Sequence, residues 1–427
     1  MQHDTGRIDD VTLRRLLQSR EIPFNARPNG VQTHRAASSD LLAQDVQDAA
    51  HFSDDQLARK ARFQIRQPRQ NLVDRREIAQ LLLCRHVTML YRDGPGFQPC
   101  YLPFFMDPIT VLVISNPTAA YLRLLERLPE PVNIHTGNDE KFLAEHAPEA
   151  DVILVGALKH DLLRSIFPVA RRVRWVHAMW AGVEKLLFPE LVESAVPLTN
   201  GRGVFKDGLA EFTIASILFF AKDLRRLIRN QEAGLWEQFE SLEVRKQVLG
   251  IVGYGGIGRE SARLARALGM QVHAIRRQLT DSNADPNLDR MFPLSALRQM
   301  LAGCDYVLIA TPLTEETRGM IGEAELAAMK PSAVLINVGR GPVVVESALI
   351  AALEQGRIKG AALDVFDTEP LPSGHPFYRL PNVLLSPHSA DHTVGWFDLG
   401  MNKFIENFER FRNGQPLENI VDKRAGY

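Results

Sequence analysis

The chain has 427 residues, of which 45% are hydrophobic and 24% are charged, and its formal net charge is −1. A single hydrophobic core stops growing at about 250–300 residues, so this length predicts two or three domains. The near-neutral charge balance argues against a nucleic acid or a membrane surface as the main partner.

Residues 1–105 differ from the rest of the chain. They are rich in arginine and in scattered turn-forming residues, and they show no sustained alternation of strands and helices. One helix is predicted over 73–83, and little else in this stretch is periodic. We therefore expect a poorly ordered or unrelated extension here, with the folded part of the chain beginning near Met106.

Three features bear on the cellular compartment. Residues 1–10 lack the apolar core of a secretory signal. The longest apolar run, residues 212–221, is little more than half of the ~20 residues that a membrane-spanning helix needs, and it predicts a buried helix. Cys84, Cys100 and Cys304 show neither metal nor redox spacing and fit a reducing compartment. We expect a cytoplasmic protein without a metal site.

Beyond Met106, short apolar strands alternate with helical patterns. A first series of strands is predicted at 110–115, 151–155 and 173–178. A long amphipathic helix follows over 207–229, with Asp207 as its N-cap. A second series is predicted at 248–253, 271–275, 305–310, 333–337, 360–365 and 382–386. This rhythm predicts an α/β fold with two doubly wound parallel sheets, and the spare apolar residues of the last helix, 396–414, predict that it returns to the first sheet.

The stretch GYGGIG in the second series has the pattern G-x-G-x-x-G. Gly253 would permit the tight turn, Gly255 would let backbone approach a pyrophosphate, and Gly258 would let the helix pack close to the strand. Amides around Gly256 and Ile257 would face the phosphates at the helix start. Because the pattern follows a strand, opens a helix and precedes another strand, it predicts a dinucleotide site.

Two arginines, Arg276 and Arg277, stand at the end of the next strand, where an acidic residue would grip the ribose of NAD. A guanidinium cannot accept a hydrogen bond, but it can donate charge-assisted bonds to the 2′-phosphate of NADP. The alternative is a solvated arginine pair on a loop. The position favours NADPH as the cofactor, with NADH still possible.

Three further stretches end predicted strands of this series: NVGRGP with Arg340, DVFDTEP with Asp364 and Glu369, and SPH with His388. Together with the glycine turn, in this order and at these spacings, they resemble the D-isomer-specific 2-hydroxyacid dehydrogenase family. The resemblance covers roughly residues 106–425, and residues 1–105 have no counterpart in it.

The family resemblance implies a fold and a set of boundaries. It implies a flavodoxin-like substrate domain formed by residues 106–206 and 390–427, and a Rossmann nucleotide-binding domain formed by residues 207–389. It also implies a homodimer, built through the 207–229 helix and the region of Trp236.

The same resemblance implies catalytic roles that the chemistry of the residues supports. His388 would protonate the ketone oxygen during reduction, because an imidazole titrates near neutral pH. Glu369 would bind its far ring nitrogen and raise its pKa. Arg340 would hold and polarise the substrate, and the amides of Ala181 and Gly182 would bind its carboxylate.

Further residues are implied at the cofactor. Asp364 would lie beside the nicotinamide carboxamide, and the remaining implied contacts are Thr311, Pro312, Val338 and Gly339. An arginine at position 276 is common among NADPH-preferring glyoxylate and hydroxypyruvate reductases. The leading hypothesis is therefore NADPH-dependent reduction of a small 2-keto acid to the D-2-hydroxy acid.

Several alternatives stay open at this point. One is an NAD-dependent dehydrogenase working toward oxidation, and another is a related nucleotide-sensing corepressor that uses the fold as a binding module. His392 is a rival for the catalytic histidine. Trp180 either narrows the substrate pocket or packs in the core.

Overall fold

The computed structural model describes residues 107–156, 160–276 and 285–426. All of these residues belong to one compact unit. The expected extension over 1–105, its helix at 73–83 and Arg277 lie outside the described residues.

The first sheet has five parallel strands in the order β2-β1-β3-β4-β5. Its members are β1 (Ile109–Ile114), β2 (Val132–Gly137), β3 (Val152–Val155), β4 (Trp175–Ala178) and β5 (Leu198–Asn200). Because β1, β3 and β4 are buried along their whole length, they consist almost entirely of apolar residues. The strand order reverses between β1 and β3, as in flavodoxin-like folds.

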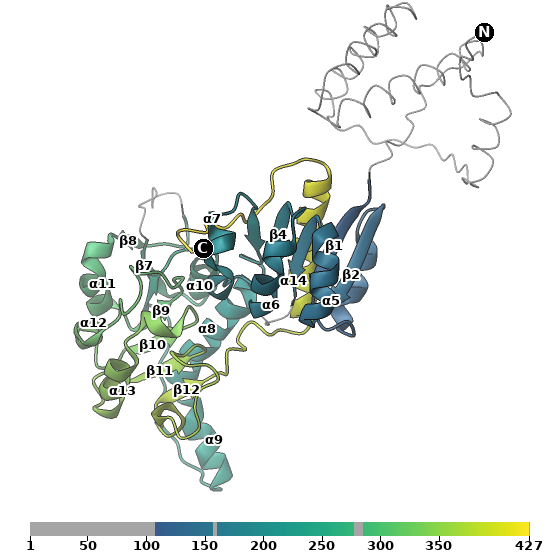
Figure 1. Cartoon of the computed structure of the whole chain (residues 1–427). Helices are drawn as coiled ribbons and strands as arrows, with labels where there is room; N and C mark the ends of the chain where they lie inside the picture. Colours follow the sequence, from purple (N-terminus) through teal and green to yellow (C-terminus); the bar gives the residue numbers. More distant parts are fainter. Residues whose placement is uncertain (1–106, 157–159, 277–284, 427) are drawn as a thin grey trace, which may run out of the picture. The chain divides into compact units, whose positions relative to one another are not determined.

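Helices cover both faces of this sheet, and we call the sheet with its helices the first lobe. One face carries α5 (Glu140–His146), α6 (His160–Ile166) and α7 (Pro189–Glu193). The other carries the 3-10 helix η1 (Ala120–Arg127) and α14 (Trp396–Arg412). Phe404 of α14 stacks on Trp175 with ring centroids 5.3 Å apart. The last helix therefore returns to the first sheet, as the sequence predicted (Figure 1).

The second sheet has seven parallel strands in the order β12-β11-β10-β9-β6-β7-β8. Its members are β6 (Val248–Val252), β7 (Gln271–Ile275), β8 (Arg290–Phe292), β9 (Tyr306–Ile309), β10 (Val334–Asn337), β11 (Gly360–Leu363) and β12 (Val383–Leu385). Outward from β6, the strands on one side are β7 and β8, and the strands on the other side are β9, β10, β11 and β12. The order therefore reverses between β6 and β9, as in Rossmann folds.

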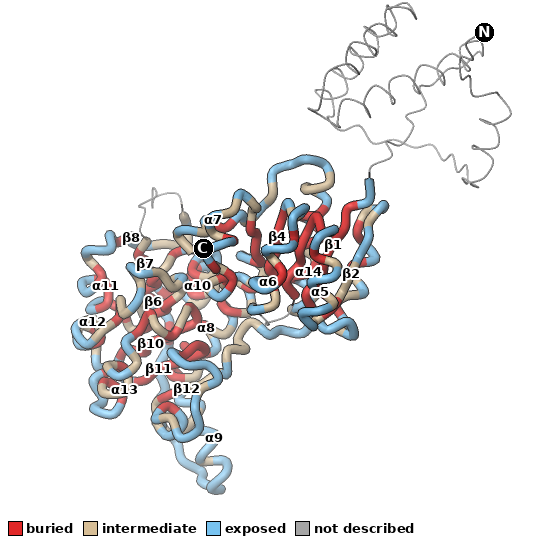
Figure 2. Tube along the Cα trace, viewed as in Figure 1, coloured by how far each residue is buried: buried red, intermediate tan, exposed pale blue. Residues whose placement is uncertain are grey.

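This sheet is also covered on both faces, and with its helices it forms the second lobe. One face carries α8 (Lys206–Ala221) and α10 (Gly256–Ala267). The other carries α11 (Leu297–Gly303), α12 (Glu323–Ala328) and α13 (Glu346–Glu354). Figure 2 shows the buried residues gathered along the strands of both lobes, which confirms two doubly wound parallel sheets.

Two details of the predicted 207–229 helix were wrong. The helix begins at Lys206 with Phe205 at the N-cap, so Asp207 lies in the first turn instead. The helix also ends at Ala221, because Asp223 adopts a left-handed backbone conformation with φ 48° and caps a second helix, α9 (Leu224–Glu232). Apolar periodicity continues across the break, which is why the sequence suggested a single helix.

Candidate active site

The glycine turn follows β6, next to the point where the strand order of the second sheet reverses. Ligands of such sheets bind beyond the carboxyl ends of the strands at this reversal. Gly253 has φ +103°, and a Cβ there would lie 2.8 Å from the backbone of Ala310. A Cβ on Gly258 would lie 2.6 Å from the carbonyl oxygen of Gly253. Both positions therefore require glycine.

Gly255 and Gly256 have open space beside them, with no heavy atom of the described residues within 4 Å of an added Cβ. Gly255 is the N-cap of α10, so the amides of Gly256, Ile257 and Gly258 lack acceptors within the helix. The hydroxyl of Thr311, which follows β9, is buried and has no hydrogen-bond partner among the described residues. This combination of donors and space fits the diphosphate of a dinucleotide.

Arg276 lies beside this turn, because β7 pairs with β6. Val252 and Ile275 are partners in the two strands, and the Gly253 amide donates to the Ile275 carbonyl over 3.2 Å. The half-buried Arg276 comes directly after Ile275, at the same edge of the sheet. The predicted position at the strand end is therefore observed.

The Thr311–Pro312 and Val338–Gly339 segments follow the neighbouring strands β9 and β10. A Cβ on Gly339 would lie 2.7 Å from the Thr311 carbonyl oxygen, so the two segments touch at this edge. The predicted cofactor contacts in the second lobe are thus brought together around the carboxyl ends of β6, β9 and β10.

His388 and Glu369 form a pair on two loops at the same edge. Nδ1 of His388 lies 2.7 Å from Oε2 of Glu369, and the other oxygen of Glu369 accepts from the Phe366 amide over 2.9 Å. The His388 side chain remains 43% exposed, so its ring is accessible to a ligand. His388 adopts φ 51°, a strained conformation for a residue with a side chain.

The contact between His388 and Glu369 also shifts the pKa values of both side chains. The hydrogen bond that His388 donates to Glu369 raises the pKa of His388 above its ordinary value, outweighing the effect of burial. Burial alone would raise the pKa of Glu369, but the His388 hydrogen bond and the Phe366 amide hold it below its ordinary value. The arrangement therefore favours an imidazolium next to a carboxylate.

Arg340 follows β10 and reaches the loop after β4 in the first lobe. Its Nε donates to Oε1 of Glu184 over 3.0 Å, and its Nη1 donates to the Gly339 carbonyl over 2.7 Å. Asn337 holds the turn, because its Nδ2 donates to the Arg340 carbonyl and its Oδ1 accepts from the Gly339 amide, both over 3.1 Å. The guanidinium is thus held by a side chain of the first lobe and a backbone carbonyl of the second.

Asp364 is buried beneath the loop that carries His388. Its Oδ1 accepts from the Ser386 hydroxyl over 2.5 Å, from the Ser389 amide over 2.9 Å and from the Ala390 amide over 3.0 Å. These bonds hold the loop on both sides of His388. The contact with a nicotinamide that the resemblance implied for Asp364 stays a prediction.

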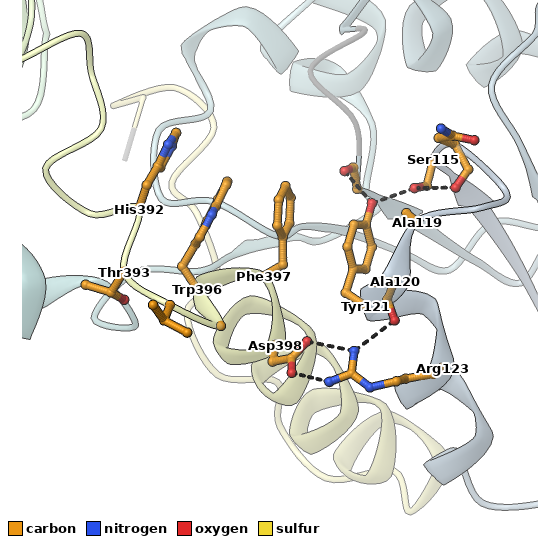
Figure 3. Close-up of a pocket in the computed structure, with 14 residues that line it drawn as sticks. Ser115, Ala119, Ala120, Tyr121, Arg123, His392, Thr393, Trp396, Phe397 and Asp398 are labelled. Atoms are coloured by element: carbon orange, nitrogen blue, oxygen red, sulfur yellow. Dashed lines mark hydrogen bonds and ion pairs between the residues drawn. The ribbon is translucent and has the colours of Figure 1, made fainter.

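A pocket of about 690 Å³ lies at the carboxyl ends of β1 and β3, where Ser115 and Gly156 contribute to its lining. Stacked rings cross it: His392 on Trp396 at 4.2 Å, Trp396 on Phe397 at 3.8 Å, and Phe397 on Tyr121 at 4.8 Å between centroids. Figure 3 shows these rings in a row and the ion pair of Arg123 with Asp398 below them. His392 is therefore stacked on an aromatic ring, with Nε2 3.7 Å from Oδ1 of Asp391, whereas His388 makes a hydrogen bond of 2.7 Å with Glu369.

Trp180 is half-buried and packs against hydrophobic clusters of both lobes. This observation favours its packing role over a role in narrowing the pocket. Of the next residues, Ala181 is exposed and Gly182 is partly buried, and Asn200 holds the loop by donating to the Ala181 carbonyl over 2.6 Å.

Three residues of this site were missed from the sequence: Glu184, Asn200 and Asn337. Each acts on a backbone turn or on another side chain. The signal in the sequence is position relative to a predicted site residue, since Asn337 is the first residue of the NVGRGP motif and Glu184 comes two residues after Gly182.

Comparison with known proteins identifies the family. The family model for the NAD-binding domain of D-isomer specific 2-hydroxyacid dehydrogenases matches residues 214–390. A glyoxylate reductase from Korarchaeum cryptofilum is 31% identical over 317 residues, which are 71% of this chain and 93% of that protein. The chain belongs to the D-isomer-specific 2-hydroxyacid dehydrogenase family. A glyoxylate reductase from Thermococcus gammatolerans is 33% identical over 295 residues, 67% of this chain and 86% of its own length.

Solved structures of this dehydrogenase family have the same fold. A family member from Xanthobacter autotrophicus, in complex with NADPH and MES, aligns with a TM-score of 0.65 at 29% identity. An NADPH-dependent glyoxylate/hydroxypyruvate reductase from Sinorhizobium meliloti, in complex with NADP and sulfate, aligns with a TM-score of 0.65 at 26% identity. Each alignment covers 75% of this chain and 100% of the other.

The chain is therefore an oxidoreductase that uses a nicotinamide cofactor. Within the described residues, every helix is too short or too polar to cross a membrane.

Proposed function

We propose that this dehydrogenase reduces a small 2-keto acid of the glyoxylate or hydroxypyruvate type to the D-2-hydroxy acid, with NADPH as the reductant. The observation that carries the proposal is the His388–Glu369 pair, 2.7 Å apart, at the same sheet edge as Arg340 and the glycine turn. This arrangement offers a proton donor, a fixed cation and a dinucleotide site together.

Each of the three polar side chains has a separate task in the proposal. His388, as an imidazolium, protonates the ketone oxygen through Nε2, while Glu369 at Nδ1 fixes the ring and stabilises its charge. Arg340 holds the substrate carboxylate and polarises the neighbouring ketone oxygen, on which negative charge develops. The amides of Ala181 and Gly182 bind the substrate carboxylate.

The second lobe supplies the cofactor site in this proposal. A bound NADPH provides the hydride, and the protein provides its orientation. The amides of the first turn of α10 and the orphaned hydroxyl of Thr311 hold its phosphates and ribose. Arg276, with Arg277 outside the described residues, selects the 2′-phosphate, which supports NADPH over NADH. NADP and NADPH complexes of the structural relatives support the same choice.

Domain boundaries, assembly and location complete the proposal. We assign residues 106–206 and 390–427 to a substrate domain and 207–389 to a nucleotide-binding domain.

A homodimer would cover the exposed apolar side chains on and after α9, namely Leu227, Ile228, Leu235 and Trp236. Burial raises the pKa of the Cys304 thiol to about 12, so this free thiol is inert and compatible with the reducing cytoplasm.

A steady-state panel tests the proposal directly. Glyoxylate, hydroxypyruvate, pyruvate and bulkier 2-keto acids are each assayed with NADPH and with NADH. We expect the highest kcat/KM for a small 2-keto acid with NADPH. A strong preference for NADH would overturn the cofactor assignment and favour an enzyme working toward oxidation. Cofactor binding without turnover of any 2-keto acid would favour a nucleotide-sensing module.

A further inference from the structure

Arg340 of the second lobe is bonded to Glu184, a residue of the first lobe to which the sequence motifs assign no role. Nε of Arg340 lies 3.0 Å from Oε1 of Glu184, although the two residues are 156 positions apart in the chain. Glu184 opens the short 3-10 helix η4 (Glu184–Leu186), directly after the loop that carries Ala181 and Gly182. The ion pair therefore joins the proposed substrate cation to the proposed carboxylate-binding loop.

The guanidinium also lies directly against this loop. A Cβ on Gly182 would lie 1.6 Å from Nη2 of Arg340 and 2.9 Å from Oε2 of Glu184. Any side chain at position 182 would therefore displace either the cation or the carboxylate. Nη1 is turned away from Gly182 by its bond of 2.7 Å to the Gly339 carbonyl.

These contacts use the donors of Arg340 selectively. A guanidinium has five N–H donors in a rigid plane, so fixing two of them fixes the direction of the others. Glu184 takes the Nε donor and Gly339 takes one donor of Nη1. The Nη2 donors are left beside Gly182, where a carboxylate bound by the loop amides would lie.

We propose that Glu184 is a positioning residue, which aims the Nη2 edge of Arg340 at the same carboxylate that the amides of Ala181 and Gly182 bind. This inference rests on the proposed 2-keto acid reduction. The two side chains are 29% and 32% exposed, so water reaches the ion pair and screens its charge, and the pair adds little to stability. Its effect is expected in substrate binding instead.

If Glu184 competed with the substrate for Arg340, its removal would change the KM in the opposite direction. If Glu184 were a competing anion that occupies Arg340 until substrate displaces it, its removal would lower the KM for the 2-keto acid. If Glu184 is a positioning residue, its removal raises the KM for the 2-keto acid, because the Nη2 edge of Arg340 no longer faces the substrate carboxylate. The sign of the change therefore decides between the two roles.

The test is steady-state kinetics of the full chain with NADPH and the best 2-keto acid of the panel. For Glu184→Ala we expect kcat/KM to fall about 10–100-fold, the effect of a misplacement on the order of 1 Å, mainly through the KM for the keto acid. The KM for NADPH should not change. Glu184→Gln should recover most of the loss, because its amide oxygen can accept from Nε in the same geometry.

A matched control is Glu323→Ala, which removes a carboxylate from another glutamate–arginine pair, 3.1 Å from Arg357 and far more exposed. It should behave as the wild type. Glu184→Asp is a second probe that keeps the charge but shortens the reach, and it should raise the KM as Glu184→Ala does. This variant also decides the question if Glu184→Ala does not fold.

The outcomes separate the inference from the function on which it rests. Wild-type kinetics in both Glu184→Ala and Glu184→Asp, or a lowered KM, would overturn the positioning role while leaving the reductase assignment intact. Failure of the wild type to reduce any 2-keto acid would overturn the proposed function, and the inference with it.

Discussion

At the scale of single residues, the site depends on side chains that hold other side chains in place. The loop that holds His388 at a left-handed φ is restrained by hydrogen bonds that Ser386 and Ser389 donate to Asp364, and the His388 ring is fixed by Glu369. Because these restraints come from the protein itself, the proton donor needs little reorganisation during reaction.

The pKa of His388 gives a prediction for the pH dependence of reduction. Reduction needs the protonated imidazole, so kcat/KM is constant at low pH and falls as pH rises through the pKa of His388. The hydrogen bond to Glu369 raises that pKa and extends activity to higher pH. In Glu369→Gln the descending limb of the pH–kcat/KM profile should therefore move to lower pH. An unchanged limb would show that another group donates the proton.

Arg276 gives a second prediction at this scale. In Arg276→Ser, we expect kcat/KM for NADPH to fall roughly 10–100-fold, since a hydrogen bond to a charged group contributes about 1.5–3 kcal/mol. Activity with NADH, which lacks the 2′-phosphate, should stay close to that of the wild type. Arg263→Ser, which removes an exposed arginine from α10, serves as the control. Equal losses with both cofactors would contradict the assignment of Arg276.

The three proposed catalytic residues could be named from the sequence because each stands in a short motif that ends a strand. Parallel strands bring their carboxyl ends to one edge, so the order of motifs already implied their convergence. Glu184 could not be found in this way. Its bond to Arg340 depends on how two sheets that are separate in the chain face each other.

At the scale of elements, apolar strands were predictable, including the three-residue β12, whereas polar strands and short strands of mixed residues were not. β1, β6, β7 and β10 agree with their predicted ranges within one or two residues. β2 was missed because it is a partly exposed edge strand with the polar sequence VNIHTG. β5 and β8 have only three residues each, too few to show a period.

The return of α14 to the first sheet gives a prediction of stability. Phe404 is fully buried and stacks on Trp175, so Phe404→Ala leaves a cavity in the first lobe. We expect the free energy of unfolding to fall by about 3–5 kcal/mol, measured by chemical denaturation. Leu399→Ala, at a 44% exposed position of the same helix, should cost much less. Similar costs in both variants would show that α14 is not part of the core.

At the scale of the whole molecule, one projecting element stands out from the second lobe. Helix α9 and the residues after it project from the lobe in Figure 1 and expose several large apolar side chains, with Trp236 95% exposed. Exposed apolar surface of this kind marks an interaction site, and a second copy of the chain is the occupant that we propose.

Sedimentation equilibrium tests the proposed dimer. We expect the wild type to sediment as a dimer and Trp236→Ser combined with Ile228→Ser to shift it toward monomer. The control is Leu294→Ser, a 41% exposed apolar residue elsewhere on the second lobe, which should leave the mass unchanged. A monomeric wild type, or a double variant that sediments with the wild-type mass, would contradict the proposal that α9 and the residues after it form a dimer interface.

The central claim is that this chain reduces a 2-keto acid with His388 as the proton donor. The most direct measurement compares the kcat of the wild type with that of His388→Gln at saturating NADPH. A fluorescence titration measures the NADPH affinity of both proteins. We predict that kcat falls about 10²–10⁴-fold, the usual contribution of a general acid, while NADPH affinity stays unchanged. Full turnover by His388→Gln would contradict the claim.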